Sequence, residues 1–102
     1  MLLAEFAISP LDKGASVSPW VARSLDLIDR SGLPYRLGPM STTVEGEWDE
    51  VMAVIKACFE RMAEDSDRIS IAFKCDWRRG RSGRLTAKVE KVEATLGRKL
   101  ST

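Results

Sequence analysis

Residues 68–77 alternate between apolar and polar side chains along their whole length, and this pattern predicts a β-strand with one buried face. Successive side chains of a strand point to opposite faces of a sheet. The face that we expect to pack against helices carries Ile69, Ile71, Phe73 and Cys75. The opposite, open face carries Ser70, Ala72, Lys74 and Asp76. The chain is therefore expected to form a sheet that helices cover on one side.

The other segments show helix and strand patterns in a definite order. Apolar residues recur at helical spacing over residues 18–31, 48–63 and 85–96. Strands are predicted over residues 2–9, 34–40 and 42–47. With the strand at 68–77, the order is β-α-β-β-α-β followed by one more helix.

This order predicts an α+β fold, a ferredoxin-like βαββαβ sandwich with an additional C-terminal helix. Right-handed crossovers place both main helices on one face and give an antiparallel sheet with strand order 4-1-3-2. The length of 102 residues, without an internal repeat or a linker, predicts a single domain over residues 1–102.

The composition removes several classes of function. Histidine is absent, so the usual general base, metal ligand and pH switch are missing. The formal charge of +1 gives no reason to expect a nucleic-acid or membrane partner. Cys58 and Cys75 lie far apart without a CxxC pair, so we expect no metal site and two buried, reduced thiols.

The sequence carries no targeting signal that would direct it elsewhere, and we expect a cytoplasmic location. The apolar segment at residues 1–8 is too short for a signal peptide, contains Glu5 and lacks a basic start. No apolar run approaches the length of a membrane span.

The open face is predicted to gather polar side chains from three adjacent strands. Alternation in the first strand places Ala4, Phe6 and Ile8 in the core and leaves Leu3, Glu5, Ala7 and Ser9 on the open face. In the third strand Val44 points to the core, so Thr43 and Glu45 are expected on the open face. The resulting cluster consists of Glu5, Thr43, Glu45, Lys74 and Asp76. It is either a solvated face with weak ion pairs or a surface on which another sheet packs, since Ala7, Ser70 and Ala72 are small.

Several blocks of the sequence are distinctive in their order and spacing. They are Pro10-Leu11-Asp12-Lys13-Gly14, Ser16-Val17-Ser18-Pro19, Ser31-Gly32-Leu33-Pro34-Tyr35, Pro39-Met40, Thr42, Glu45-Gly46-Glu47-Trp48 and Gly80-Arg81-Ser82-Gly83-Arg84-Leu85. Together they resemble the thiamine-binding YkoF-like family, which is related to the uncharacterised family 0045 proteins. The resemblance covers essentially the whole chain. It implies a ferredoxin-like fold that assembles through open sheet faces into dimers and dimers of dimers, that is, homotetramers.

The resemblance also implies binding of thiamine or its hydroxymethylpyrimidine part, without known catalysis and without a cofactor. Thiamine joins a cationic thiazolium to an aminopyrimidine that offers hydrogen-bond donors and ring-nitrogen acceptors. On this basis we predict Glu5 and Glu45 as acidic contacts, with hydroxyls from Ser9, Thr42 and Thr43. Lys74 and Asp76 would set the local charge or bind the phosphate of a phosphorylated vitamer. Trp48 either stacks on a ring or serves ordinary packing.

The same residues leave three other functions to consider. RNA binding would use the basic patch of Arg78, Arg79, Arg81 and Arg84 beside Trp77, but acids on the open face repel phosphate, and we expect no nucleic-acid partner. Catalysis by Glu5, Glu45 and Asp76 lacks an activated nucleophile, a phosphate-binding glycine loop and zinc ligands, so we expect no enzyme. The remaining alternative is an interaction protein whose open face serves only homo-oligomer assembly.

Overall fold

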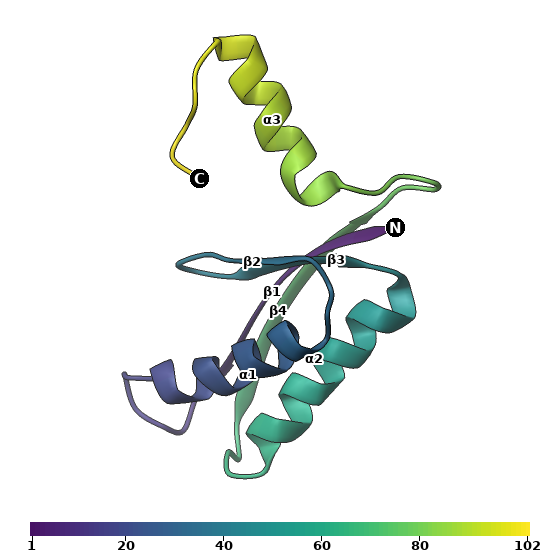
Figure 1. The fold of residues 1–102 in the computed structure, drawn as a ribbon. Helices are drawn as coiled ribbons and strands as arrows, with labels where there is room; N and C mark the ends of the chain where they lie inside the picture. Colours follow the sequence, from purple (N-terminus) through teal and green to yellow (C-terminus); the bar gives the residue numbers. More distant parts are fainter.

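The computed structural model describes residues 1–102, and its elements follow the predicted order (Figure 1). In chain order they are β1 (Leu2–Pro10), α1 (Ser18–Arg30), β2 (Tyr35–Leu37), β3 (Thr42–Gly46), α2 (Trp48–Ala63), β4 (Ile69–Trp77) and α3 (Arg84–Leu96). The predicted strand at residues 34–40 is shorter than expected. Its hairpin with β3 turns through Gly38 to Ser41.

The four strands form one antiparallel sheet in the order β2-β3-β1-β4, which is the predicted order read from the other edge. Figure 1 shows α1 and α2 on one side of the sheet and α3 on the other. No helix is long and apolar enough to cross a membrane. The α+β ferredoxin-like fold predicted from the sequence is thus confirmed.

The core lies between the sheet and the pair α1 and α2. Its ten buried side chains are Leu2, Ala4, Phe6, Ile8, Ile28, Val44, Val51, Val54, Cys58 and Met62. The alternation of β1 is confirmed, because every second residue from Leu2 to Pro10 is buried. Burial raises the pKa of the Cys58 thiol, which donates a hydrogen bond to the Ser24 carbonyl at 3.6 Å.

The predicted burial of the β4 face is wrong. Cys75 is exposed, and Ile71 and Phe73 keep 42% and 40% of their surface accessible. These residues do share a face with the core residues of β1, because Phe73 pairs with Phe6 and Cys75 with Ala4. However, β4 is an edge strand, and the helices pack mainly over its neighbours. The alternation therefore identified the face correctly but not how much of it the helices cover.

The last helix, α3, stands apart from the rest of the molecule (Figure 1). None of its residues is buried, and Val92 and Leu96 of its apolar stripe are 40% and 49% exposed. A helix of this length is only marginally stable in water without packing. Its position therefore depends on the contacts at its first turn, which are described below.

The hairpin of β2 and β3 opens a gap beside β1. Pairing between β1 and β3 ends at Phe6 and Thr42, so β1 continues for four residues, Ala7 to Pro10, without a neighbour on that side. On its other edge β1 remains paired with β4 through Pro10. The space left beyond Thr42 is bounded by α1 on the helix side of the sheet.

Two loops at the end of the sheet are joined by Asp12. Its carboxylate accepts hydrogen bonds from the Ser66 hydroxyl at 2.6 Å and from the Asp67 backbone amide at 2.7 Å. These bonds, with the Ser66 contribution the larger, lower the pKa of Asp12 below its ordinary value of 3.8.

The lowered pKa of Asp12 predicts a pH dependence of stability. The ionised carboxylate stabilises the folded state above pH 3.8, and this contribution is lost as the pH falls through the lower pKa of the folded protein. We expect Asp12→Asn to lower the thermal midpoint at neutral pH, and the difference from wild type to shrink toward pH 2. Melting curves by circular dichroism across this range measure it. A difference that does not change with pH would contradict the assignment.

Candidate ligand-binding site

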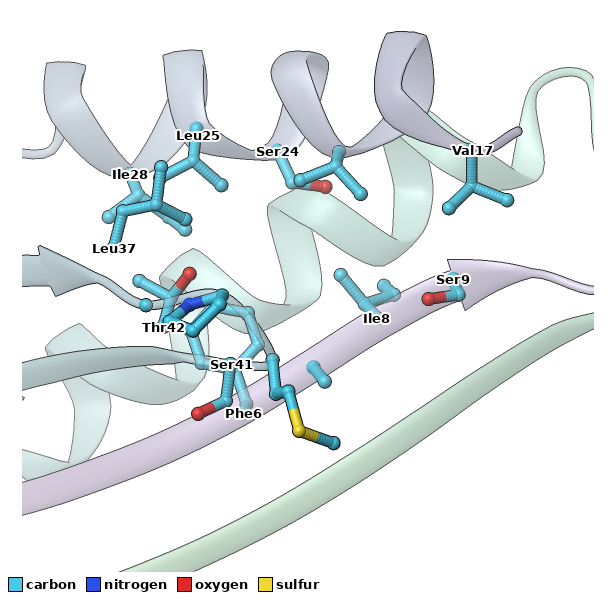
Figure 2. Close-up of a pocket in the computed structure, with 15 residues that line it drawn as sticks. Phe6, Ile8, Ser9, Val17, Ser24, Leu25, Ile28, Leu37, Ser41 and Thr42 are labelled. Carbon is cyan, nitrogen blue, oxygen red and sulfur yellow. The ribbon is translucent and has the colours of Figure 1, made fainter. Parts of the chain in front are cut away.

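A crevice of about 210 Å³ lies in the gap between α1, the end of β1 and the β2–β3 turn. Figure 2 shows α1 above it, with Val17, Leu25 and Ile28 directed toward the sheet, and β1 below it, with Ile8 and Ser9. Residues 37–42 of the hairpin close the side where β3 leaves β1. Because the walls belong to three different elements, no single sequence motif encodes this cavity.

The crevice combines apolar walls with several hydroxyl groups. Nine of its fifteen lining residues are hydrophobic, and the hydroxyls come from Ser9, Ser24, Ser41 and Thr42. Sites for drug-sized ligands usually measure roughly 300–1,000 Å³. A cavity of 210 Å³ is therefore suited to one ring with a few hydrogen-bonding groups, while the rest of a longer ligand would extend outside.

A second cavity, of about 440 Å³, adjoins the crevice at the hairpin turn. The two cavities share the lining residues Phe6, Ala7, Met40 and Ser41. The second cavity is lined on the open-face side by Glu5, Ala72 and Lys74. A ligand seated in the crevice could thus reach the open face beside Ser41.

Glu5 stands at this junction with part of its carboxylate available. Its Oε2 accepts a hydrogen bond from the Ser41 hydroxyl at 3.0 Å. Lys74 is its direct neighbour across β4 but forms no ion pair with it. Glu5 is exposed, so its free oxygen can meet a cationic group of a ligand.

Glu45, the other predicted acidic contact, has a different role in the structure. Its side chain is only 4% exposed. Its two oxygens accept hydrogen bonds from the backbone amides of Gly83 at 3.1 Å and Arg84 at 2.7 Å. The first turn of α3 has no side-chain cap of its own, so the Glu45 carboxylate supplies the missing acceptors. Its negative charge also interacts favourably with the positive end of the helix dipole.

Asp76 is also occupied by the segment that leads into α3. The guanidinium of Arg84 forms an ion pair with the Asp76 carboxylate and donates a second bond to its backbone carbonyl at 3.0 Å. Arg78 lies 3.7 Å from the same carboxylate. The strand register thus places the predicted open-face residues on adjacent strands. However, contacts with the start of α3 occupy Glu45 and Asp76 and separate them from Glu5.

The predicted site residues therefore fall into separate places. Ser9 and Thr42 line the crevice, and Glu5 and Lys74 line the adjoining cavity. Thr43 lies between Glu5 and Arg36 in the sheet register and lines neither cavity. Trp48 is an exposed residue at the start of α2, outside both cavities.

Ser24, Met40 and Ser41 are among the lining residues of these cavities that were not predicted as site residues. Ser24 is a buried polar residue within the apolar stripe of α1, and this exception to the helical pattern was visible in the sequence. Met40 falls at the end of the predicted strand at residues 34–40, and Ser41 falls between the two predicted strands. Their role depends on how the turn folds over β1, which local patterns do not specify.

Comparison with known proteins gives consistent matches over almost the whole chain. A family model described as thiamine-binding protein matches residues 4–93. The UPF0045 protein of Mycobacterium bovis is 38% identical over 96 residues, which cover 93% of this chain and 94% of that protein. The UPF0045 protein of Methanocaldococcus jannaschii is 30% identical over 91 residues, which cover 89% and 91%.

Solved structures share the same architecture. A hypothetical protein from Methanocaldococcus jannaschii gives a TM-score of 0.82 at 30% identity, covering 89% of this chain and 94% of that chain. A Thermotoga maritima protein, named as a candidate thiamine biosynthesis/salvage protein, gives 0.78 at 24% identity, covering 89% and 97%. At this lower identity the second likeness is evidence for the fold alone.

Proposed function

The chain belongs to the thiamine-binding protein family, and from this premise we propose that it binds thiamine or the related hydroxymethylpyrimidine without transforming it. We further propose that it does so as a homo-oligomer in the cytoplasm. The observation that carries the proposal is the junction at Ser41. There a ring-sized crevice lined with hydroxyls meets the exposed carboxylate of Glu5.

We assign the two halves of thiamine to the two cavities on the chemistry of the residues that line them. The aminopyrimidine is a flat ring whose amine and ring nitrogens can bond with the hydroxyls of Ser9, Ser24 and Thr42, between the apolar walls of the crevice. The thiazolium carries a positive charge and would lie beside Glu5, across the shared wall of Ser41. We place Glu45 outside the ligand contacts, since α3 occupies both of its oxygens.

Binding without catalysis agrees with the description of the family, which is that of a binding protein and not of an enzyme. A serine nucleophile requires an adjacent base that a third group orients. Ser41 does contact Glu5, but no other side chain forms a hydrogen bond with that carboxylate. The pair is therefore better suited to holding a cation than to activating the hydroxyl.

The homo-oligomer is supported by how little of the chain is buried. Only 16 of 102 residues are buried. The radius of gyration is 15.0 Å, compared with about 13 Å for a compact domain of this length. The exposed apolar stripe of α3 and the uncovered face of β4 are surfaces that further subunits could cover.

Isothermal titration calorimetry with thiamine and, separately, with hydroxymethylpyrimidine tests the proposal. We expect saturable binding of both by the wild-type protein. Glu5→Gln removes the charge but keeps the shape, so it should weaken binding of cationic thiamine about tenfold and change that of the neutral pyrimidine little. Glu60→Gln, the same change on an exposed position of α2, is the matched control and should bind like wild type.

Two results would contradict this assignment. Equal affinity of wild type and Glu5→Gln for thiamine would show that Glu5 is not the cation contact. Absence of heat with either ligand, in a folded oligomer of known mass, would refute ligand binding. The open face would then serve assembly alone, which its small cross-strand pair Ala7 and Ala72 also suits.

A further inference from the structure

A third cavity, of about 520 Å³, lies between the open face of β4 and α3. Its nine lining residues include six basic side chains and one acidic side chain. The basic residues come from three segments: β4, the loop after it and α3. They are Lys74, Arg78, Arg81, Arg84, Lys88 and Lys91. We refer to this cavity as the basic cleft.

The basic cleft concentrates positive charge that the rest of the chain balances. The formal charge of the whole chain is only +1. Asp76, the acid of the cleft, pairs with Arg84 and Arg78. The other four cations, which are Lys74, Arg81, Lys88 and Lys91, form no ion pair with a carboxylate of this chain. The cleft is therefore short of negative charge.

The two walls of the cleft are fixed relative to each other. Glu45 and Asp76 hold the first turn of α3 against the sheet through the amide and guanidinium groups of Arg84. Lys88 and Lys91 are three residues apart and share one side of the helix. They line the cleft opposite Lys74 of β4. The arrangement thus brings exposed ammonium and guanidinium donors from both walls to one open cleft.

We propose that the basic cleft binds a phosphate or diphosphate group. Such a group carries two or more negative charges and several acceptor oxygens, which match a set of arginine and lysine donors. Lys74 lines both the basic cleft and the cavity that contains Glu5. The anion would therefore belong to a phosphorylated form of the ligand, a step that rests on the proposed function.

The order of the cavities matches the order of groups in such a ligand. The hydroxyl-lined crevice meets the Glu5 cavity at Ser41, and the Glu5 cavity meets the basic cleft at Lys74. A pyrimidine, a cationic thiazolium and a phosphate ester follow one another in the same sequence. A polynucleotide fits less well, because the open face beside the cleft carries Glu5 and presents no aromatic side chain for base stacking.

Calorimetric titration of the full chain with inorganic pyrophosphate tests the cleft directly. We expect saturable binding that weakens with added salt. The double variant Lys88→Ala with Lys91→Ala keeps good helix formers and should lose affinity for pyrophosphate by about tenfold or more. The control, Arg30→Ala with Lys56→Ala, removes the same charge from exposed positions of α1 and α2 and should bind like wild type.

Titration with thiamine and thiamine diphosphate separates this inference from the proposed function. If wild type binds thiamine diphosphate more tightly than thiamine, and the variant Lys88→Ala with Lys91→Ala loses this difference in affinity, both the anion site and the proposed function are supported. Pyrophosphate binding that depends on the two lysines, without thiamine binding, would support the anion site and refute the proposed function.

The cleft proposal alone would be overturned if the protein bound thiamine, did not bind pyrophosphate, and bound thiamine diphosphate no more tightly than thiamine. The cleft proposal would also be overturned if the protein bound a single-stranded RNA oligonucleotide but not pyrophosphate. An equal loss of pyrophosphate affinity in the control variant would overturn it as well.

Discussion

Replacing Glu45 with alanine is expected to release α3 from the sheet while the βαββαβ body stays folded. The carboxylate accepts two backbone hydrogen bonds from the start of α3, at Gly83 and Arg84. Hydrogen bonds to a charged group contribute about 1.5–3 kcal/mol each, so α3 should lose about 3 kcal/mol or more of docking free energy. No residue of α3 is buried, so little apolar packing offsets the loss.

Hydrogen exchange followed by mass spectrometry measures this release. Amides of residues 84–96 should exchange close to the rate of an unfolded peptide in Glu45→Ala, while those of β1 and α2 keep their protection. Glu45→Gln offers one acceptor oxygen in place of two and should give an intermediate result. Glu90→Ala, at an exposed position of α3, is the control.

The same variant connects α3 with the basic cleft. If α3 undocks, Lys88 and Lys91 leave β4, and affinity for pyrophosphate should fall together with helix protection. Full protection of residues 84–96 in Glu45→Ala would show that other contacts hold the helix, and the capping role assigned to Glu45 would then be wrong.

The fold was predictable because local patterns and topology agree. The alternation at residues 68–77 and the helical stripe at 48–63 identified β4 and α2 almost to their ends. Once the element order was known, right-handed crossovers left one strand order, and this order is confirmed. Burial on β4 was not predictable in this way. A strand pattern shows which side chains share a face, but not how far two helices extend across the sheet.

The candidate site was predictable only in part, for a related reason. Glu5, Ser9, Thr42 and Lys74 line the cavities because strand register fixed their positions. The roles of Glu45 and Asp76 depend on where α3 docks, and a helix pattern carries no information on docking. One signal was nevertheless present. Gly83 precedes α3 where a capping side chain is usual, so the first amides of the helix were left for water or for an acceptor from elsewhere in the chain.

The unpartnered surfaces of the molecule bear on how subunits would assemble. The open face carries the small cross-strand pairs Ala7 with Ala72 and Ser9 with Ser70 at the end away from α3. Stacked sheets lie about 10 Å apart, and the side chains between them lose contact with water, which costs little for small residues and several kcal/mol for an unpaired charge. The end near α3 is occupied by the helix and the basic cleft. Stacking is therefore expected over the small residues alone. A second sheet placed there would cover the Glu5 cavity, which Ala7 and Ala72 also line, and would leave the basic cleft open.

Replacing Ala72 with arginine should consequently dissociate the proposed homo-oligomer. An arginine at this position would fill the space between stacked sheets and bury an unpaired guanidinium, at an effective cost of several kcal/mol. We expect the mass measured by light scattering after size exclusion to fall at least twofold, with the circular dichroism spectrum unchanged. Ala53→Arg, the same substitution on the exposed surface of α2, should keep the mass of wild type.

An unchanged mass for Ala72→Arg would exclude stacking through the open face. Assembly would then have to use other exposed apolar residues, such as Ile71 and Phe73 of β4 or Val92 and Leu96 of α3.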